Sequence, residues 1–202
     1  MYDFQFQTVS RIISGLGSIE ELRTILTEQR CQKVLLVTDI GMLQQQLHLP
    51  LLEILEHLHL PYVIYADVIA DPPEQIVHAA IEFAIQEQVD TVIGFGGGSS
   101  LDVAKLIAVL AHPDQQQKLS DLYGINQAKP PRLPLILVPT TAGTGSEVTP
   151  ISIVMTGETT KMGIVAPVLY ADVAILDATF TQSLPAHITA ATGIDAMVHA
   201  IE

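Results

Sequence analysis

Two patterns of hydrophobic positions alternate along the middle of the chain. Short β-branched runs are typical of buried strands, and longer segments with apolar residues three or four positions apart are typical of helices. Runs of the first kind cover residues 33–38, 62–65, 91–95 and 135–138, and apolar stripes of the second kind lie within 43–58, 76–84 and 103–111. Strands that alternate with helices through short connections predict βαβ units around a parallel sheet. The continuous apolar strands indicate a sheet that is buried on both faces.

The pattern changes in the second half of the chain. Residues 114–132 are polar and include a pair of prolines, which predicts a surface loop. After residue 140 we expect short strands at 151–155, 162–165 and 173–176, and a last helical segment that begins at Ala186. This segment reaches Glu202 with no glycine cap and no helix breaker, which leads us to expect a truncated chain.

Composition limits the classes of partner. The chain has 202 residues, of which 49% are hydrophobic and 15% charged, and its formal net charge is −13. Such acidity repels nucleic acids and anionic membranes, so we expect neither as a partner. No basic and apolar signal segment begins the chain, and no apolar stretch approaches the length of a membrane span, so we expect a cytoplasmic protein. A single cysteine, Cys31, excludes an internal disulfide.

A glycine-rich segment, Gly94 to Asp102 (GFGGGSSLD), follows one predicted strand and opens a helix. Glycines let backbone N–H groups approach a ligand closely, and a helix N-terminus attracts phosphate. Ser99 and Asp102 have the spacing of a capping box, which would fix the start of the helix. A tight turn without a ligand is the alternative, and the segment matches neither common nucleotide-binding fingerprint. The strand–turn–helix context favours pyrophosphate binding.

Two further polar features follow predicted strands. Asp39 comes directly after residues 33–38, where a carboxylate either binds a ribose diol, which would favour NAD over NADP, or caps the next helix. The segment Pro139 to Glu147 (PTTAGTGSE) follows residues 135–138 and supplies hydroxyls and glycines for the hydrogen-bonding parts of a cofactor. A Ser/Thr turn without a ligand is the alternative for this second segment.

The last helical segment carries Asp195 and His199, which lie four positions apart and therefore share one helical face. Their neighbours are apolar, so burial of the two polar groups would be costly unless they were paired or bound to a metal. A carboxylate with an imidazole suits Fe(II) or Zn(II), and a partly exposed Asp–His pair is the alternative. A catalytic metal needs about three protein ligands, so the others would have to lie beyond Glu202.

These segments together resemble the iron-containing (group III) alcohol dehydrogenase family. The resemblance rests on GFGGGSSLDVAK (residues 94–105), PTTAGTGSEVT (139–149), KMGI (161–164), and then ILDATFTQSLP and TAATGIDAMVHAIE in the same order. It implies an α/β fold: a Rossmann-like parallel sheet flanked by helices in a dinucleotide-binding domain over residues 1–184. Residues 185–202 would then be the first helix of a metal-binding all-helical domain whose remainder is absent.

The resemblance also assigns residues to the site. The cofactor-binding residues that it implies are Asp39, Gly97, Gly98, Ser99, Thr140, Thr141, Thr144 and Lys161, and the metal ligands are Asp195 and His199. Asp39 would select NAD, the two glycines with Ser99 would hold the pyrophosphate, the threonines would line the cofactor and Lys161 would reach a ribose. Pro73 lies where many members have an asparagine, and it can supply neither that side chain nor an N–H donor.

The activity implied is hydride transfer between NAD(H) and a small alcohol, aldehyde or ketone, with Fe²⁺ (or Zn²⁺) as a Lewis acid. Two alternatives are an NAD- and metal-dependent lyase similar to dehydroquinate synthase and a non-catalytic nucleotide-binding fragment. We expect the isolated fragment to be inactive, because half a ligand set does not hold a catalytic metal tightly. An apolar last helix without its domain would be exposed, so we expect aggregation or self-association, such as a homo-oligomer.

Overall fold

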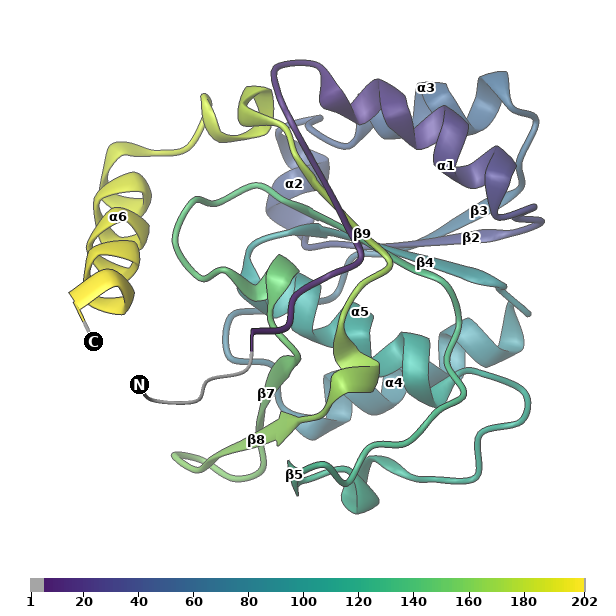
Figure 1. Ribbon diagram of the computed structural model, residues 1–202, viewed down its shortest axis with the longest axis vertical. Helices are drawn as coiled ribbons and strands as arrows, with labels where there is room; N and C mark the ends of the chain where they lie inside the picture. The colour runs from purple at the N-terminus through teal and green to yellow at the C-terminus, as the bar shows by residue number, and fades with distance from the viewer. Residues whose placement is uncertain (1–5, 202) are drawn as a thin grey trace.

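The computed structural model describes residues 6–201, and at its centre lies a six-stranded sheet whose strands all run parallel (Figure 1). The spatial order is β1 (Arg11–Ser14), β9 (Val173–Leu176), β6 (Leu135–Pro139), β4 (Thr91–Gly96), β2 (Val34–Val37) and β3 (Tyr62–Tyr65). The strands expected in the first half of the chain are thereby confirmed as neighbours in one sheet. The Rossmann-like α/β class is confirmed with them.

Helices cover both faces of the sheet, as Figure 1 shows. One face carries α1 (Leu22–Glu28), α2 (Ile40–Gln44) and α3 (Leu49–His57), and the other carries α4 (Glu74–Gln86) and α5 (Gly98–Leu110). Strand β2 shows why both faces are buried: Val34 and Leu36 pack with α1 and α3, whereas Leu35 and Val37 pack with α4 and α5. Successive side chains of a strand point to opposite faces, so a strand between two helical layers is apolar throughout.

The single apolar stripe expected within residues 43–58 is divided between two helices, which corrects that prediction. The chain leaves helical geometry at Gln46, where φ is 58°, and α3 begins with Pro50 in its first turn. Proline is tolerated in the first turn because its missing N–H would have no partner there. Buried Met42 of α2 and Leu51 of α3 pack into the same core, so the stripe stays continuous across the break.

Residues 114–132 are more than the expected surface loop. They contain a 3-10 helix, η2 (Leu119–Asp121), and β5 (Gly124–Ile125), which joins a small sheet with β8 (Lys161–Val165) and β7 (Ile151–Met155). The side chains of Leu119, Leu122 and Ala128 are buried. The prediction was wrong because apolar residues are sparse in this segment and yet most of them face the core.

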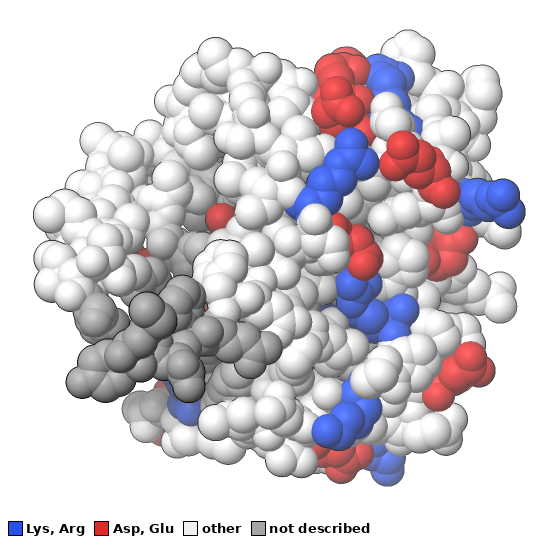
Figure 2. Space-filling model, viewed as in Figure 1, with Lys and Arg blue, Asp and Glu red and all other residues white. Residues whose placement is uncertain are grey.

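The last helix, α6 (Ala186–Ile201), lies apart from the sheet and its flanking helices (Figure 1). It has no buried residue, and Met197 is 63% exposed and Ile201 80% exposed. Figure 2 shows that the surface over α6 is almost without charged side chains in this view, whereas acidic and basic groups gather over the strands and α1. The exposure expected of this apolar helix is confirmed. No helix within residues 6–201 is long and apolar enough to cross a membrane.

Candidate functional site

Three polar loops meet at the carboxyl edge of the central sheet. Val37 of β2 pairs with Gly94 of β4, and Gly96 of β4 pairs with Pro139 of β6, so the loops after these strands leave the sheet side by side. The chain runs outward from β2 to β3 and then returns to place β4 on the opposite side of β2. Ligands of open α/β sheets bind at such a reversal of strand order, which here separates Asp39 from the glycine-rich segment.

The glycine-rich segment leaves the start of α5 open. Gly96 has a φ of 145°, and a Cβ there would lie 2.8 Å from Ser100 Oγ and 3.3 Å from Asp39 Oδ2. Gly97 is the N-cap of α5 and no side chain caps the helix, so the first N–H groups of a 13-residue helix are free for an anion. The capping role expected of Ser99 and Asp102 was wrong, because the Asp102 carboxylate is occupied by other partners.

The loop after β6 packs against the glycine-rich segment. A Cβ on Gly98 would lie 3.1 Å from Thr144 Cγ2, so the absence of a side chain there lets the two loops approach. Thr144 Oγ1 also accepts a hydrogen bond from Ser146 N at 3.2 Å, which is the local turn considered as an alternative. The buried Oγ1 atoms of Thr140 and Thr141 have no hydrogen-bond partner in the part of the chain that the structure describes. Buried hydroxyls are normally paired, so these two fit a ligand with polar groups.

Asp39 is an N-cap, and this alternative is confirmed. Its Oδ1 accepts hydrogen bonds from Gly41 N at 2.9 Å and Met42 N at 3.2 Å at the start of α2. Because both bonds use Oδ1, Oδ2 remains directed toward the glycine-rich segment, as the distance to the Gly96 Cβ position shows. The ribose contact stays a prediction, and the cap is compatible with it.

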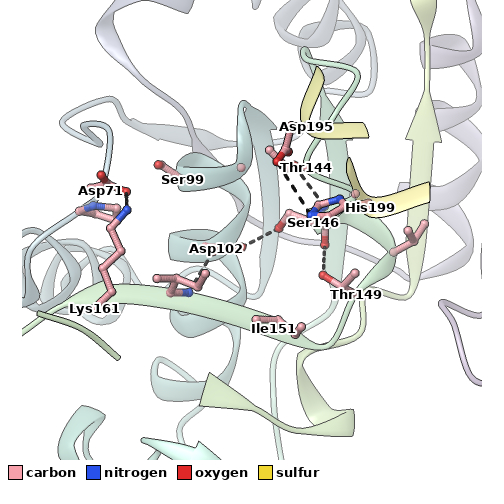
Figure 3. A pocket seen from close by; sticks show the side chains of 15 residues that line it. Asp71, Ser99, Asp102, Thr144, Ser146, Thr149, Ile151, Lys161, Asp195 and His199 are labelled. Carbon is pink, nitrogen blue, oxygen red and sulfur yellow. Dashed lines mark hydrogen bonds and ion pairs between the residues drawn. The ribbon is translucent and has the colours of Figure 1, made fainter. Parts of the chain in front are cut away.

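Two hollows meet at the start of α5. The smaller hollow, as we name it, has a volume of about 420 Å³ and is lined by Asp39, residues 68–70 and residues 97–100. The larger cleft has a volume of about 850 Å³ and is lined by Asp71, Asp102, Ser146, Lys161, Asp195 and His199 among others (Figure 3). Gly98 and Ser99 belong to both linings, so a long ligand that spans the two hollows must pass over the N-terminus of α5.

An ion pair lies at one end of the cleft. Lys161 Nζ, from β8, is 2.6 Å from Asp71 Oδ1, and Figure 3 shows the pair at the opposite end from Asp195 and His199. The loop that carries Asp71 is tied to β7 by a hydrogen bond from Met155 N to Pro72 O at 3.0 Å. Lys161 thus lines the cleft, while its contact with a ribose stays a prediction.

Asp195 and His199 face each other on α6. Oδ1 of Asp195 lies 3.9 Å from Nε2 of His199, and the side chains are 46% and 54% exposed. The geometry therefore matches the partly exposed pair considered from the sequence. The donors also suit a divalent metal, but no third His, Cys, Asp or Glu joins them within residues 6–201.

Sequence reasoning missed Lys105, a fully buried lysine of α5 beneath the cleft. Its Nζ donates hydrogen bonds to Ile151 O at 2.6 Å and to Ser146 Oγ at 2.7 Å, and lies 3.3 Å from Asp102 Oδ1. Burial lowers the pKa of Lys105, against the opposing effect of the Asp102 carboxylate. The only signal in the sequence is the spacing of an Asp three residues before a Lys on a helix that is otherwise apolar.

The sequence profile of one family, described as iron-containing alcohol dehydrogenase, matches residues 9–178. The chain belongs to the iron-containing alcohol dehydrogenase family. The matched residues include all three loops that meet at the carboxyl edge of the sheet.

Relatives in the iron-containing alcohol dehydrogenase family extend well beyond this chain. The chain is 39% identical to the sulfoacetaldehyde reductase of Bilophila wadsworthia over 98% of its own length and 51% of that protein. It is 42% identical to long-chain-alcohol dehydrogenase 1 of Geobacillus thermodenitrificans, over 93% of its own length and 48% of that protein. The crystal structure of sulfoacetaldehyde reductase from Bifidobacterium kashiwanohense in complex with NAD⁺ is 29% identical, with a TM-score of 0.90 over 100% of this chain and 53% of that one. The chain thus spans about half the length of these relatives.

Proposed function

We propose that the chain is the NAD(H)-binding part of a metal-dependent dehydrogenase that interconverts small alcohols with aldehydes or ketones. One observation carries the proposal: two hollows on the carboxyl edge of the sheet share Gly98 and Ser99 at the uncapped start of α5. A dinucleotide is two nucleosides joined by a pyrophosphate, so it has the shape that such a pair of hollows accommodates. Relatives that are named as alcohol dehydrogenases and reductases support the reaction class.

The polar groups give the dinucleotide a direction. The hollow beside Asp39 suits the adenosine, because Oδ2 of Asp39 is free to accept hydrogen bonds from the ribose diol and would repel a 2′-phosphate. The nicotinamide then occupies the larger cleft, with Lys161 near its ribose and Asp195 and His199 at the far end (Figure 3). Bound there, the nicotinamide would exchange a hydride with the substrate carbon.

Asp195 and His199 would supply two of the ligands of Fe²⁺ or Zn²⁺ at the end of the cleft. A metal at this position would act as a Lewis acid on the substrate oxygen. The chain's own contribution is positional: α6 presents both donors from successive turns of one face, so the separation of the two groups is fixed by the helix.

The chain alone should bind nucleotide without oxidising alcohol. Within residues 6–201 only Asp195 and His199 are placed to hold the metal, and two ligands do not hold a catalytic metal tightly. Alcohol-dependent NADH production by the purified 202-residue chain would contradict this inference. The assay should include added Fe²⁺ and, separately, Zn²⁺, so that lack of metal is not the cause of a negative result.

Nucleotide binding is tested by NADH fluorescence titration of the wild type, Ser99→Asp and Ser99→Asn. An acidic residue in the first turn of α5 is favourable for the helix, yet its charge repels a pyrophosphate. Ser99→Asp should therefore keep or raise the denaturation midpoint while it weakens NADH binding by about tenfold or more.

Ser99→Asn is the matched control, since it has the same size without the charge, and it should bind NADH more tightly than Ser99→Asp. Equal affinities for the two variants would exclude a pyrophosphate at the start of α5. A wild type that binds no NADH would overturn the proposed function as a whole.

A further inference from the structure

Asp102, Lys105 and Ser146 form one hydrogen-bonded cluster beneath the larger cleft, which we name the buried clip. Ser146 Oγ donates to Asp102 Oδ1 at 2.6 Å, and Lys105 Nζ contacts both residues. The clip joins α5, which starts at the glycine-rich segment, to the 3-10 helix η3 (Ser146–Val148) in the second polar loop. Lys105 is completely buried and Ser146 nearly so, while Asp102 is slightly open to the cleft.

The clip also holds the first residues of β7. Lys105 Nζ donates to Ile151 O at 2.6 Å, and Ile153 N donates to Asp102 Oδ2 at 3.0 Å. Both isoleucines line the cleft, so the lysine and the aspartate fix the backbone from which two cleft side chains project. Each oxygen of the Asp102 carboxylate has a partner, and the Lys105 ammonium has three acceptors for its three protons.

Burial of an ammonium costs desolvation free energy. A buried carboxylate beside it contributes less to stability than apolar side chains packed in the same space would. Such a pair is better suited to hold separate segments in one geometry, because its hydrogen bonds have defined directions. Here the joined residues are 41 to 51 positions apart along the chain, from Lys105 to Ser146 and from Asp102 to Ile153, and no disulfide links the segments.

We infer that Lys105 is a positioning residue for the nicotinamide half of the dinucleotide. It acts through Asp102, Ser146 and the start of β7, which form the wall of the larger cleft, and it is not among the residues that line the smaller hollow. The inference rests on the proposed function. The inference adds to that function a residue that lies outside the cleft and yet determines how well one half of the cofactor fits.

Lys105→Met keeps an unbranched side chain, one atom shorter, and removes its three donors. The test compares the Kd of NADH with that of ADP, which lacks the nicotinamide half, for the full chain. We expect NADH binding to weaken by about tenfold while ADP binding changes by less than about twofold, because only the cleft wall loses its support.

Ser152→Ala is the control for a general loss of stability. Ser152 is fully buried on β7 and its Oγ donates to Asp102 O at 3.1 Å, so this variant removes one buried hydrogen bond between β7 and α5 but keeps the clip's own bonds to Ile151 and Ile153. It should lower the melting temperature and leave the ratio of the two Kd values unchanged. If Lys105→Met fails to fold, Ser146→Ala replaces it, since it removes one partner of Lys105 and keeps Asp102 and Ile151; the same selective loss is expected.

A selective loss of NADH affinity in the clip variants supports the inference. Equal losses for NADH and ADP, or the same ratio in Ser152→Ala as in Lys105→Met, would overturn it and leave the proposed function intact. A wild type that binds neither nucleotide would overturn the proposed function and this inference together.

Discussion

Asp177, at the end of β9, should be one of the largest single polar contributions to the stability of the chain. The residue is 1% exposed, and its carboxylate accepts four hydrogen bonds. The donors are Gly17 N at 3.1 Å, Ile19 N at 3.1 Å, Thr179 N at 3.0 Å and Thr179 Oγ1 at 2.7 Å. One side chain thus binds the first N–H groups of two 3-10 helices, η1 (Ser18–Glu21) and η5 (Ala178–Thr181), and connects segments 160 residues apart.

Asp177→Ala removes the shared acceptor from all four donors. The N–H of Ile19 is buried and would be left without a partner, whereas those of Gly17 and Thr179 can reach water. We therefore expect a loss of about 3 kcal/mol in the free energy of unfolding at pH 7. This is the range expected when a charged acceptor is removed from one buried donor and from several donors that water can reach. Urea denaturation with linear extrapolation measures it.

The effect should depend on pH in a defined direction. Burial alone would raise the pKa of Asp177, but its hydrogen bonds outweigh burial and lower the pKa below the ordinary value of 3.8. A carboxylate with a lowered pKa in the folded state contributes stability above the unfolded pKa and loses it as the pH falls through the folded pKa. The difference between the wild type and Asp177→Ala should be complete at pH 7 and should shrink in the acid range below 3.8.

Asp121→Ala is the matched control, because this exposed carboxylate accepts one backbone hydrogen bond, from Lys118 N at 2.8 Å. It should cost less than about 1 kcal/mol. A loss for Asp177→Ala no larger than that of the control, or a loss that is the same in acid as at pH 7, would refute the reasoning.

Three further predictions concern the site and its supports. Gly94→Ala should lower the free energy of unfolding by about 1–3 kcal/mol in urea denaturation, since its Cβ would lie 2.7 Å from Leu137 Cδ2; no change would mean that α5 and the sheet adjust freely. Gly143→Ala should displace α6, because its Cβ would lie 2.5 Å from Thr192 O. Proteolysis of the segment before α6 should become faster, while the urea midpoint of the sheet stays nearly unchanged. An unchanged rate of proteolysis would show that the loop around Gly143 accommodates the added methyl group. Asp39→Ala should cost about 1 kcal/mol through loss of the cap, and should raise the affinity for NADPH relative to NADH in fluorescence titrations; a ratio equal to that of the wild type would separate this carboxylate from the ribose.

Hydrophobic patterning predicted the centre of the sheet well, because β2, β4 and β6 are buried on both faces and read as unbroken apolar runs. It gave no indication of β1, which is a four-residue edge strand with Arg11 and Ser14 exposed. The break at Gln46 was also invisible, since apolar residues continue at helical spacing on either side of it. Patterning detects how many faces of an element are buried, and it cannot detect a backbone angle.

Within the site, the sequence identified the loops and the resemblance assigned their residues. Asp39, the glycine-rich segment and the threonine loop are each placed by the strand before them, so local sequence sufficed. Lys105 was missed because two of its three partners, Ser146 and Ile151, lie more than forty residues away, and its burial depends on the loop that folds over it. Whether Asp102 caps its own helix or serves another segment is likewise a question of tertiary structure.

The way in which α6 is attached has a mechanical consequence. At Thr192 the helix comes directly against Gly143, where an added Cβ would lie 2.5 Å from Thr192 O, and α6 buries no side chain of its own. Asp195 and His199 belong to the same rigid helix, so a rotation of α6 would change their distance from the glycine-rich segment and leave their distance from each other unchanged. Whatever packs on the exposed side of α6 would therefore set the width of the cleft at this end.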